Sequence, residues 1–600
     1  MRSAPQARRL LCALALVSSV LPLAPARADH DTPDLDEIDP VRFSLSQAVV
    51  ERRMITARDG LTSLALDVIR PNTTEPVPTI LLQSPYYSTL GRGYKAERKP
   101  PWTQTAALNP PTPWAPFPEW YDEYFVPRGY AIVLQDQRGT RNSSGCQVYG
   151  GREEITDAVD TIEWIARQPW SNGAVGMTGG SYDGTIATGA ASMAPPALKA
   201  IIPIRSIDRW YEYHHFNGVP SSQHAGTAEG FTVTRPLTDL QNSQNEDPLY
   251  AAHLAERRAC AASVGALVAA SYKPGYQDAR SDFWAGRDFL KDASRITAAT
   301  FIIHGLNDTN VKTIHAGHLW AALPASTPKK LWWLRGGHDD PANPSLTFPL
   351  QSRFYEATHR WYARYLKGID TGVEHQGPVS IQGEDGTWTD GLAWPPPGGD
   401  RTLYLTPTAL SDTPAEGTLT YTDGVVTPVA GGTGTAGSSI TLDGPPLEED
   451  LRVAGQAYVR LRYALSRGGD TTFAYRLLDV PPTGSAREIA SAYARGAYRD
   501  QIAFRGPSYP ILPQVHEPGR AYDIAFPFVH QDYVVPEGHR LRLIVRADDE
   551  RVTAGGNGSD VTLTLGGLSA LVVPDSASRE AEDLRARCTF HPSLPECEGD

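Results

Sequence analysis

Short apolar runs alternate with amphipathic stretches along the first two thirds of the chain. The runs that predict buried strands are residues 79–82, 131–134, 174–178, 300–303 and 331–334. Ile155, Val159, Ile162 and Ile165 recur at helical spacing and predict a helix with one buried face, and residues 351–366 predict a second helix. Strands and helices that alternate in this way are typical of an α/β domain with a largely parallel sheet.

Two segments depart from this pattern. Residues 206–292 are rich in Tyr, His, Asn and Ala and contain no clear strand, so we expect a helical insertion that covers the sheet and shapes a substrate pocket. After residue 375, apolar and charged residues alternate in short runs such as 457–463 and 540–545, and Gly, Pro and Asp separate the runs. This pattern predicts strands with one solvated face that pack as a β-sandwich.

The chain is therefore predicted to contain an α/β domain over residues 40–375, with the helical cap at 206–292, and a β-sandwich over 376–575. A tail over 576–600 follows. A length of 600 residues agrees with more than one core. With 41% hydrophobic and 20% charged residues, the composition indicates a globular protein rather than a disordered or fibrous one. The formal net charge of −13 argues against nucleic acid as a partner, because phosphate binding needs a basic face.

The first 28 residues have the pattern of a signal peptide. Three arginines precede a short apolar run over residues 10–23, and Ala26-Arg27-Ala28 has the small residues that a signal peptidase requires. The apolar run is shorter than the ~20 residues of a membrane-spanning helix. We therefore expect cleavage after Ala28, secretion of the protein, and a mature chain without a membrane segment. The pattern leaves the Sec and Tat export routes both open.

Four cysteines remain after this segment, at Cys146, Cys260, Cys588 and Cys597. An even number of cysteines in an exported chain predicts two disulfides. Three pairings are possible, and proximity favours Cys588–Cys597, which would tie the tail and leave Cys146–Cys260. A metal site is the alternative, but the chain has no CxxC or HxxxH spacing, so we expect no metal and no other cofactor.

A glycine-rich turn, Gly179-Gly180-Ser181-Tyr182-Asp183-Gly184, follows the strand predicted at 174–178. We expect a helix to begin near Thr185. In a nucleophile elbow, a serine occupies a sharp strand-to-helix turn and needs small neighbours because the backbone folds back on itself. The turn departs from the pattern G-x-S-x-G, since Asp183 occupies the place of the second glycine and Gly184 follows it. Ser181 is the candidate nucleophile, and a serine in an ordinary glycine turn is the alternative.

A serine nucleophile needs a base, and the base needs a group that orients it. In the α/β-hydrolase fold these partners follow in the order serine, acid, histidine, each just after a strand. Asp308 follows the strand predicted at 300–303, and His338 follows the strand predicted at 331–334. Asp339 is a rival acid, but a neighbour in the same turn is poorly placed to bond the ring. The histidines that we expect to be packing or pocket residues include His214, His215, His224 and His304.

Acyl transfer also requires hydrogen-bond donors for the oxyanion that develops on the substrate. The backbone N–H of Tyr182, directly after the nucleophile, is the expected first donor. A second donor should come from the loop after an early strand, and Ser84-Pro85-Tyr86-Tyr87 is that loop. The phenol of Tyr86 could donate, although spacing alone favours an ordinary loop aromatic.

Several of these motifs resemble the cocaine esterase / X-prolyl dipeptidyl-peptidase family of serine hydrolases (CocE/NonD, peptidase S15). The strand and Asp-x-Arg-Gly turn at 129–139 and the elbow at 172–184 resemble the corresponding segments of the family. The acid motif at 304–312, the histidine motif at 337–341 and the segment 203–213 look like those of the peptidase branch. The resemblance extends over nearly the whole chain after the signal peptide.

The resemblance implies roles for further residues. Tyr86 matches the tyrosine that donates to the oxyanion, and Trp210 and Tyr213 match pocket aromatics that hold a proline ring. It also implies that the sandwich is a jelly roll without a catalytic role. Thr309 departs from the peptidase branch, where a bulky aromatic stands beside the acid.

These expectations lead to a secreted serine hydrolase that releases X-Pro dipeptides from peptide N-termini through an acyl-enzyme. Such an enzyme must bind a free amino group with a carboxylate, for which Glu212 and Glu229 are candidates, although each could be a solvated surface charge. An esterase or amidase of the same family, acting on small acyl esters, is the alternative. A hypothesis from another class is a non-catalytic protein that binds polysaccharide. We expect a small peptide or ester as the partner, and the oligomeric state stays open.

Overall fold

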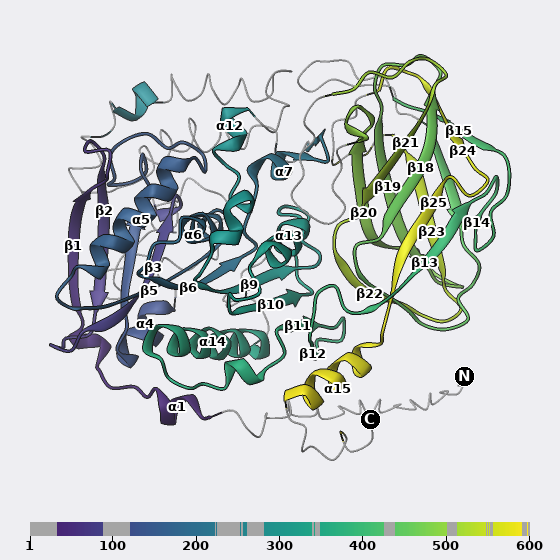
Figure 1. Ribbon diagram of the computed structural model, residues 1–600. Helices are drawn as coiled ribbons and strands as arrows, with labels where there is room; N and C mark the ends of the chain where they lie inside the picture. The colour runs from purple at the N-terminus through teal and green to yellow at the C-terminus, as the bar shows by residue number, and fades with distance from the viewer. Residues whose placement is uncertain are drawn as a thin grey trace, which may run out of the picture.

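The computed structural model describes most of the chain. The described residues are 33–87, 120–221, 224, 253, 256–260, 281–338, 341, 348–424, 438–500, 513–547, 549, 551, 556–590 and 597. They form an α/β part and a β-sandwich that stand side by side (Figure 1). The predicted signal peptide lies outside the described residues. Within the described part, no helix is long and apolar enough to cross a membrane.

A ten-stranded mixed sheet forms the α/β part, in the order β1-β2-β4-β3-β5-β6-β9-β10-β11-β12. Its strands are β1 (Val49–Thr56), β2 (Ser63–Arg70), β3 (Val77–Ser84), β4 (Ala131–Asp136), β5 (Ser171–Gly180), β6 (Leu198–Ile204), β9 (Ala299–Gly305), β10 (Lys329–Leu334), β11 (Val379–Gln382) and β12 (Trp388–Gly391). The strands from β4 to β11 are parallel to their neighbours, and antiparallel pairs occur at both edges. Each of the five runs predicted as strands lies within one of these strands, which confirms the α/β class.

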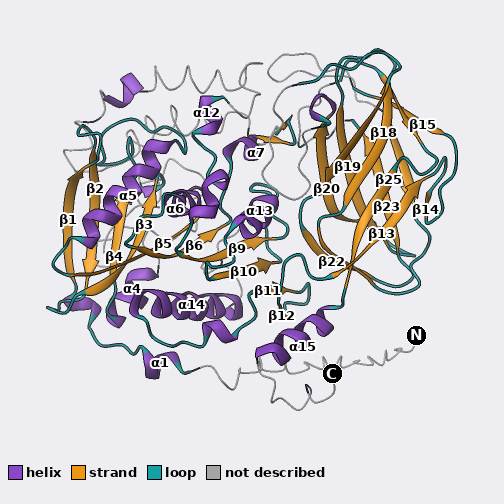
Figure 2. Ribbon diagram, viewed as in Figure 1, coloured by secondary structure: helices purple, strands orange, loops and turns teal. Residues whose placement is uncertain are grey.

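Helices cover both faces of this sheet (Figure 2). One face carries α5 (Arg152–Ala166), α6 (Tyr182–Ser192) and α13 (Ile314–Ala322), and the other carries α4 (Tyr121–Phe125) and α14 (Phe348–Tyr362). Leu81 contributes to the core on the first face, whereas its neighbours Ile80 and Leu82 contribute to the core on the other. This alternation follows from the two-residue repeat of a strand, and it explains why the central strands are apolar throughout.

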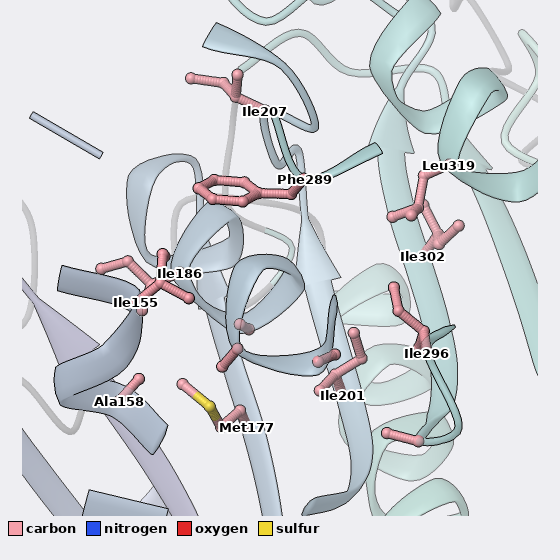
Figure 3. Close-up of a cluster of buried hydrophobic side chains, with 14 of the residues drawn as sticks. Ile155, Ala158, Met177, Ile186, Ile201, Ile207, Phe289, Ile296, Ile302 and Leu319 are labelled. Atoms are coloured by element: carbon pink, nitrogen blue, oxygen red, sulfur yellow. The ribbon is translucent and has the colours of Figure 1, made fainter. Parts of the chain in front are cut away.

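The core on the α5/α6 side joins elements that are far apart in the sequence. Figure 3 shows Ile155 and Ala158 of α5 and Ile186 of α6 in one cluster with Met177 of β5 and Ile201 of β6. The helix predicted from the spacing of Ile155 to Ile165 is confirmed, because its apolar stripe is buried. The helix predicted at 351–366 is present as α14, followed by a π-helical turn (Ala363–Lys367).

Our expected end of the α/β domain, residue 375, falls before two strands that belong to its sheet. Leu331 of β10 lies opposite Val379 of β11, and β11 pairs with β12. The sheet therefore continues to Gly391. The two strands are short, so their sequence cannot be told from the strands of the sandwich, and only the pairing with β10 assigns them.

The rest of the chain forms a sandwich of a nine-stranded and a four-stranded sheet. The first sheet contains β13 (Gly398–Leu405), β14 (Leu410–Ser411), β15 (Thr418–Thr422), β17 (Leu451–Gly455), β18 (Tyr458–Leu465), β21 (Ala521–Pro527), β22 (Gln531–Val535), β24 (Asp560–Thr564) and β25 (Ala570–Ser576). The second contains β16 (Ser439–Asp443), β19 (Thr472–Val480), β20 (Arg487–Arg495) and β23 (Arg540–Arg546). Buried and more exposed residues alternate in β18 and β23, as the sequence predicts.

Several short elements connect these parts. They are α1 (Leu35–Ile38), α7 (Trp210–His214), β7 (His215–Phe216), β8 (Val219–Pro220), α12 (Asp282–Ala285) and the 3-10 turns Leu45–Gln47, Val126–Arg128, Leu290–Arg295, Val373–His375 and Gly496–Tyr498. Of the cap predicted at 206–292, only residues 206–221, 224, 253, 256–260 and 281–292 are described, so most of it lies outside the described residues. After β25, helix α15 (Arg579–Phe590) returns to the ten-stranded sheet of the α/β part, where Asp390 of β12 donates its N–H to Asp583 (2.9 Å).

Candidate active site

Ser181 lies in a sharp turn between the end of β5 and the start of α6. Its φ of 58° and ψ of −120° are unusual for a residue with a side chain. The strained backbone is what a nucleophile elbow needs, because it turns the hydroxyl above the sheet edge. The helix begins at Tyr182, three residues earlier than we expected from the sequence, so Tyr182 rather than Thr185 is its first residue.

The two glycines beside Ser181 are explained by close packing. A Cβ atom at Gly179 would lie 2.4 Å from the Cβ of Asp183. A Cβ atom at Gly184 would lie 2.6 Å from the carbonyl oxygen of Gly179 and 3.1 Å from the backbone of Ile204. The second glycine is therefore required at 184, where α6 approaches β6, and the departure from the usual spacing does not disturb the elbow.

Hydrogen bonds fix the elbow to the neighbouring strand. The N–H of Ser181 donates to the carbonyl oxygen of Ile204 (2.8 Å). The carbonyl oxygen of Ser181 accepts from the N–H and the hydroxyl of Thr185, both at 3.0 Å. The Thr185 hydroxyl in turn accepts from the N–H of Ile207 (2.8 Å). The strained serine is thus held by β6 and by the segment after it.

The strands that precede the three candidate catalytic residues end side by side. Gly180 of β5 lies opposite Ile204 of β6, Ile204 lies opposite Ile303 of β9, and Ile303 lies opposite Trp332 of β10. Each candidate comes shortly after one of these strands: Ser181 after β5, Asp308 after β9 and His338 after β10. The parallel sheet therefore delivers all three to its carboxyl-terminal edge, where α/β enzymes form their sites.

Asp308 and His338 form a hydrogen-bonded pair. Nδ1 of His338 lies 2.7 Å from Oδ2 of Asp308, and Oδ1 accepts from the N–H groups of Asn310 and Val311, each at 2.9 Å. Burial acts to raise the pKa of Asp308, but the hydrogen bond and charge of His338 and the charge of Arg205 outweigh it, so the pKa is lowered. An ionised Asp308 accepts the Nδ1 proton and leaves Nε2 of His338 to act as a base.

The loops that carry this pair are bonded to each other. The Asn307 side chain donates to the carbonyl oxygen of Arg335 (2.6 Å), and the N–H of Asn307 donates to that of Gly336 (3.2 Å). His304 is buried, which lowers its pKa to about 4, and its Nε2 lies 2.8 Å from the carbonyl oxygen of Val311. His304 is therefore a neutral packing residue, as we expected. The rival acid Asp339 lies outside the described residues.

The two candidate oxyanion donors flank Ser181. Tyr182 begins α6, where N–H groups point out of the helix towards an incoming anion. Leu81 of β3 lies opposite Met177 of β5, so β3 ends beside β5, and Tyr86 follows β3. The N–H of Tyr86 donates to the Ser84 hydroxyl (3.0 Å), and its partly exposed ring packs against the core beneath α6. The roles of both residues stay predictions.

Trp210 and Tyr213 of α7 lie between the elbow and the acid turn. The ring of Trp210 is 4.9 Å from that of Tyr182, next to the nucleophile. The hydroxyl of Tyr213 lies 3.1 Å from Oδ1 of Asn310, next to the acid, and its ring stacks on His224. The cap is thus joined to both halves of the candidate site. That these aromatics hold proline remains a prediction.

The two candidate carboxylates for an amine differ in what the structure describes. Glu212 is buried rather than solvated, which raises its pKa, and Oε1 lies 3.8 Å from Arg209, itself buried. An internal arginine therefore already compensates its charge. Glu229 lies outside the described residues. Within the described residues, no group of three or more His, Cys, Asp or Glu side chains is arranged to hold a metal ion.

Sequence reasoning did not identify Asn310 and Glu154. Asn310 bridges the acid turn to the cap, since Nε2 of His224 also lies 3.0 Å from its Oδ1. Glu154 is fully buried below the elbow and accepts the phenol hydrogen of Tyr182 (2.8 Å). The available signal for Glu154 was its position next to Ile155, at the start of the apolar stripe of α5.

Both disulfides form with the pairing that proximity favours. Cys146 is joined to Cys260 and Cys588 to Cys597, with Cα atoms 5.5 and 5.4 Å apart. The first disulfide connects the turn after β4 to the cap segment 256–260. There the N–H of Gly145 donates to Glu256 (3.0 Å), and Arg257 donates to the carbonyl oxygen of Ser143 (3.3 Å). The cap is therefore attached covalently beside the candidate site.

Comparison with known proteins identifies the family. The model of the X-Pro dipeptidyl-peptidase (S15 family) matches residues 59–340, and that of the X-Pro dipeptidyl-peptidase C-terminal non-catalytic domain matches residues 371–574. A candidate Xaa-Pro dipeptidyl-peptidase of Streptomyces avermitilis is 30% identical over 88% of this chain and 83% of its own. This chain belongs to the X-Pro dipeptidyl-peptidase (S15) family. A second relative from this family, from Bacillus anthracis, is 27% identical over 84% of each chain.

Solved structures support the fold of this S15-family member. A CocE/NonD family hydrolase from Staphylococcus aureus aligns with a TM-score of 0.69 at 18% identity, over 88% of this chain and 94% of that one. An α-amino acid ester hydrolase aligns with a TM-score of 0.64 at 20% identity, over 92% of this chain and 100% of that one. The α/β-hydrolase core with a C-terminal β-sandwich is confirmed. The chain is a serine hydrolase rather than the non-catalytic binding protein considered from the sequence.

Proposed function

We propose that this S15-family hydrolase is secreted and releases X-Pro dipeptides from the N-termini of peptides. The observation that carries the proposal is the Asp308–His338 hydrogen bond at the sheet edge where the Ser181 elbow also lies. Each of the three has the role that its surroundings favour: a strained serine, an imidazole bonded to the acid through Nδ1, and a buried carboxylate that orients it.

In this mechanism, Oγ of Ser181 attacks the carbonyl carbon that follows proline, and Nε2 of His338 takes the hydroxyl proton. The N–H of Tyr182 and the phenol of Tyr86 bind the oxyanion. His338 then gives its proton to the leaving amine, which departs and leaves an acyl-enzyme. A water molecule, deprotonated by His338, hydrolyses the ester and releases the X-Pro dipeptide. Asp308 keeps the imidazole oriented throughout.

The placement of Trp210 and Tyr213 supports a proline-binding pocket. Flat aromatic walls suit a pyrrolidine ring because they offer apolar area without flexibility. Both side chains come from α7, which contacts Tyr182 on one side and Asn310 on the other. The two rings meet edge to face with centroids 5.7 Å apart, and a pyrrolidine ring packed against this pair would place the following carbonyl near Ser181. Glu229 stays our candidate for binding the free amino group.

An esterase or amidase acting on small acyl esters is the second candidate. The observation in its favour concerns Glu212, one of our two candidates for binding the substrate amine. This side chain is buried beside Arg209, so its carboxylate already has a partner inside the protein. Without a carboxylate for the ammonium group, the enzyme would not need a free N-terminus.

A substrate panel separates the two candidates. We expect alanyl-prolyl p-nitroanilide to be cleaved much faster than its N-acetylated form or a simple aryl ester, since the amine should contribute a charge-assisted contact. Ser181→Ala should abolish turnover and labelling by a fluorophosphonate. Equal turnover of the free and blocked peptides would contradict the peptidase and favour the esterase.

Secretion is part of the proposal and rests on two features. Residues 1–28 have the pattern of a signal peptide, and two disulfides join the four remaining cysteines. Disulfides persist in oxidising compartments. Mass spectrometry of the protein recovered from the medium should give an N-terminus at Asp29, and retention of the protein inside the cell would contradict export.

A further inference from the structure

We infer that Glu154 is a positioning residue that fixes both the nucleophile elbow and one wall of the substrate pocket. The inference rests on the proposed roles of Ser181 and Trp210. Glu154 touches neither the reacting atoms nor the substrate. It acts through Tyr182, the residue after the nucleophile, and through Gly150, on which Trp210 rests.

The carboxylate of Glu154 accepts three hydrogen bonds inside the protein. Oε1 accepts from the N–H of Val148 (2.8 Å), and Oε2 accepts from the N–H of Gly150 and the phenol of Tyr182, both at 2.8 Å. The side chain is fully buried at the start of α5. Three donors directed at one buried carboxylate form a stiff arrangement, because hydrogen bonds to a charged acceptor are strong and directional.

The hydrogen bond from Tyr182 connects Glu154 to the proposed oxyanion site. Tyr182 begins α6 and supplies the proposed oxyanion N–H, so the position of its backbone decides how well the oxyanion is bound. Its ring is buried, and its phenol is anchored by Glu154. Displacing an oxyanion donor by a fraction of an ångström weakens stabilisation of the transition state more than binding of the ground state.

The hydrogen bond from Gly150 connects Glu154 to the proposed substrate pocket. Gly150 has a φ of +69°, and a Cβ atom there would lie 2.2 Å from Nε1 of Trp210. The indole therefore lies directly on the backbone of Gly150, and it also packs 4.5 Å from the ring of Tyr149. The loop whose N–H groups Glu154 binds is thus the support of the proposed proline-binding tryptophan.

Arg287 from the cap completes the arrangement. Its Nε donates to the carbonyl oxygen of Tyr149 (2.8 Å), and its guanidinium also donates to that of Val148. The N–H groups of this loop therefore bond to Glu154 and two of its carbonyl groups bond to Arg287. The charged and titratable groups that act on Glu154 are Arg287, Tyr182 and, more remotely, Arg138.

Protonation of Glu154 should loosen this arrangement. Burial raises the pKa of Glu154 to about 7, although the hydrogen bonds of Tyr182, Val148 and Gly150 and the charge of Arg287 oppose the rise. A protonated carboxyl group would place its own O–H among three donors, so at least one of the three bonds must break or reverse its direction. Loss of the positioning therefore adds to the decline of activity on the acid side of neutrality.

The test compares Glu154→Gln and Tyr182→Phe, with Glu153→Gln as the matched control. Glu153 is the exposed neighbour on α5. Tyr182→Phe removes the link from Glu154 to the elbow and keeps the bonds of Glu154 to Val148 and Gly150, although it also removes the phenol oxygen that accepts from the N–H of Gly150. We expect kcat for alanyl-prolyl anilide and the rate of fluorophosphonate labelling to fall about tenfold, and KM to change less than in Glu154→Gln. Glu154→Gln removes the charge and places an NH2 group where one of the oxygens accepted, so it weakens the anchoring of the Tyr182 phenol and of the loop together. We expect kcat to fall about tenfold and KM to rise several-fold. Glu153→Gln should match wild type in all three.

The pH profile distinguishes positioning from general damage. Glu154→Gln should lose the component of the acid limb that titrates near pH 7, because the amide cannot be protonated in this range. A purely structural loss would lower activity at every pH without changing the shape of the profile. Melting temperatures show whether each variant is folded.

Three outcomes would overturn the inference. The first is a folded Glu154→Gln variant whose kcat, KM and pH profile equal those of the wild type. The second applies if Glu154→Gln does not fold: a Tyr182→Phe variant whose kcat and labelling rate equal those of the wild type would then overturn the inference. Wild-type protein that hydrolyses no substrate and is not labelled at Ser181 would overturn the proposed function and the inference together, so the two failures are distinguishable.

Discussion

In the proposed mechanism, Asp308 must be buried and ionised at the same time to orient His338. Burial alone favours the neutral acid, and four donors or charges reverse this preference. The N–H groups of Asn310 and Val311 and Nδ1 of His338 contact its two oxygens, and Arg205 adds a positive charge. The lowered pKa of Asp308 keeps it charged over the working range of the enzyme.

Asp308→Asn tests this account. The amide keeps the shape of the carboxylate but cannot be charged, and it either presents an N–H to His338 or leaves the wrong tautomer. We expect kcat to fall roughly 10³- to 10⁴-fold with a melting temperature near that of wild type. Asp339→Asn is the matched control and should retain most of the activity. The reverse pattern, with Asp339 essential and Asp308 dispensable, would assign the orienting role to the rival acid.

At the scale of elements, a strand, a helix or a site residue could be predicted where the pattern that identifies it lies in one short stretch of sequence. The strands before Ser181, Asp308 and His338 are continuous apolar runs, so the sequence located these three residues. Strands at the sheet edges, such as β1 with its exposed and mixed pattern, carried no such signal. The connections of Glu154 and Asn310 depend on partners far away in the sequence, which no local pattern reveals. The start of α6 was misplaced because Tyr182 and Asp183 are equally acceptable in a turn.

Gly184→Ala tests the packing of the elbow. A Cβ atom at 184 would meet backbone atoms of Gly179 and Ile204, which cannot move unless α6 shifts against β6. Although alanine favours helices, we expect a loss of about 1–3 kcal/mol in the free energy of unfolding and slower labelling of Ser181. Gly189→Ala on the same helix is the control. There the new atom meets the side chain of Ile155, 2.6 Å from its Cδ1, rather than backbone atoms, so the loss should be smaller. A higher melting temperature for Gly184→Ala would contradict this packing.

At the scale of the whole molecule, the sandwich contacts both loops that carry the acid and the base. The side chain of Gln531 donates to the carbonyl oxygen of Leu306 (2.9 Å), two residues before Asp308. Arg335, three residues before His338, donates to the carbonyl oxygen of Asp532. Although the C-terminal domain of the family is described as non-catalytic, in this chain it supports the loops of the candidate site.

Asp532 is the centre of these contacts. Its carboxylate is fully buried and accepts from Arg452 of the sandwich (2.5 Å) and Arg579 of α15 (2.5 Å), while Arg335 lies 3.9 Å away. Burial acts to raise the pKa of Asp532, but the arginines outweigh it and the pKa is lowered. Because the folded pKa lies below the ordinary value, the ionised carboxylate stabilises the fold above that value, and the stabilisation is lost as the pH falls.

Asp532→Asn should therefore destabilise the protein by about 3–5 kcal/mol at neutral pH, since it removes the carboxylate that Arg452, Arg579 and Arg335 share, although Arg452 keeps Glu582 as a partner (2.7 Å). Because the wild type loses the same contribution in acid, the difference between the two should shrink as the pH falls. Urea unfolding at several pH values measures both effects, and labelling of Ser181 reports whether the loops of the site have moved. Asp523→Asn is the control, because Asp523 lies on the same domain with 73% of its side chain exposed and should cost less than about 0.5 kcal/mol. If Asp532→Asn matched Asp523→Asn in stability and labelling, the sandwich would be a neighbour of the catalytic loops rather than their support.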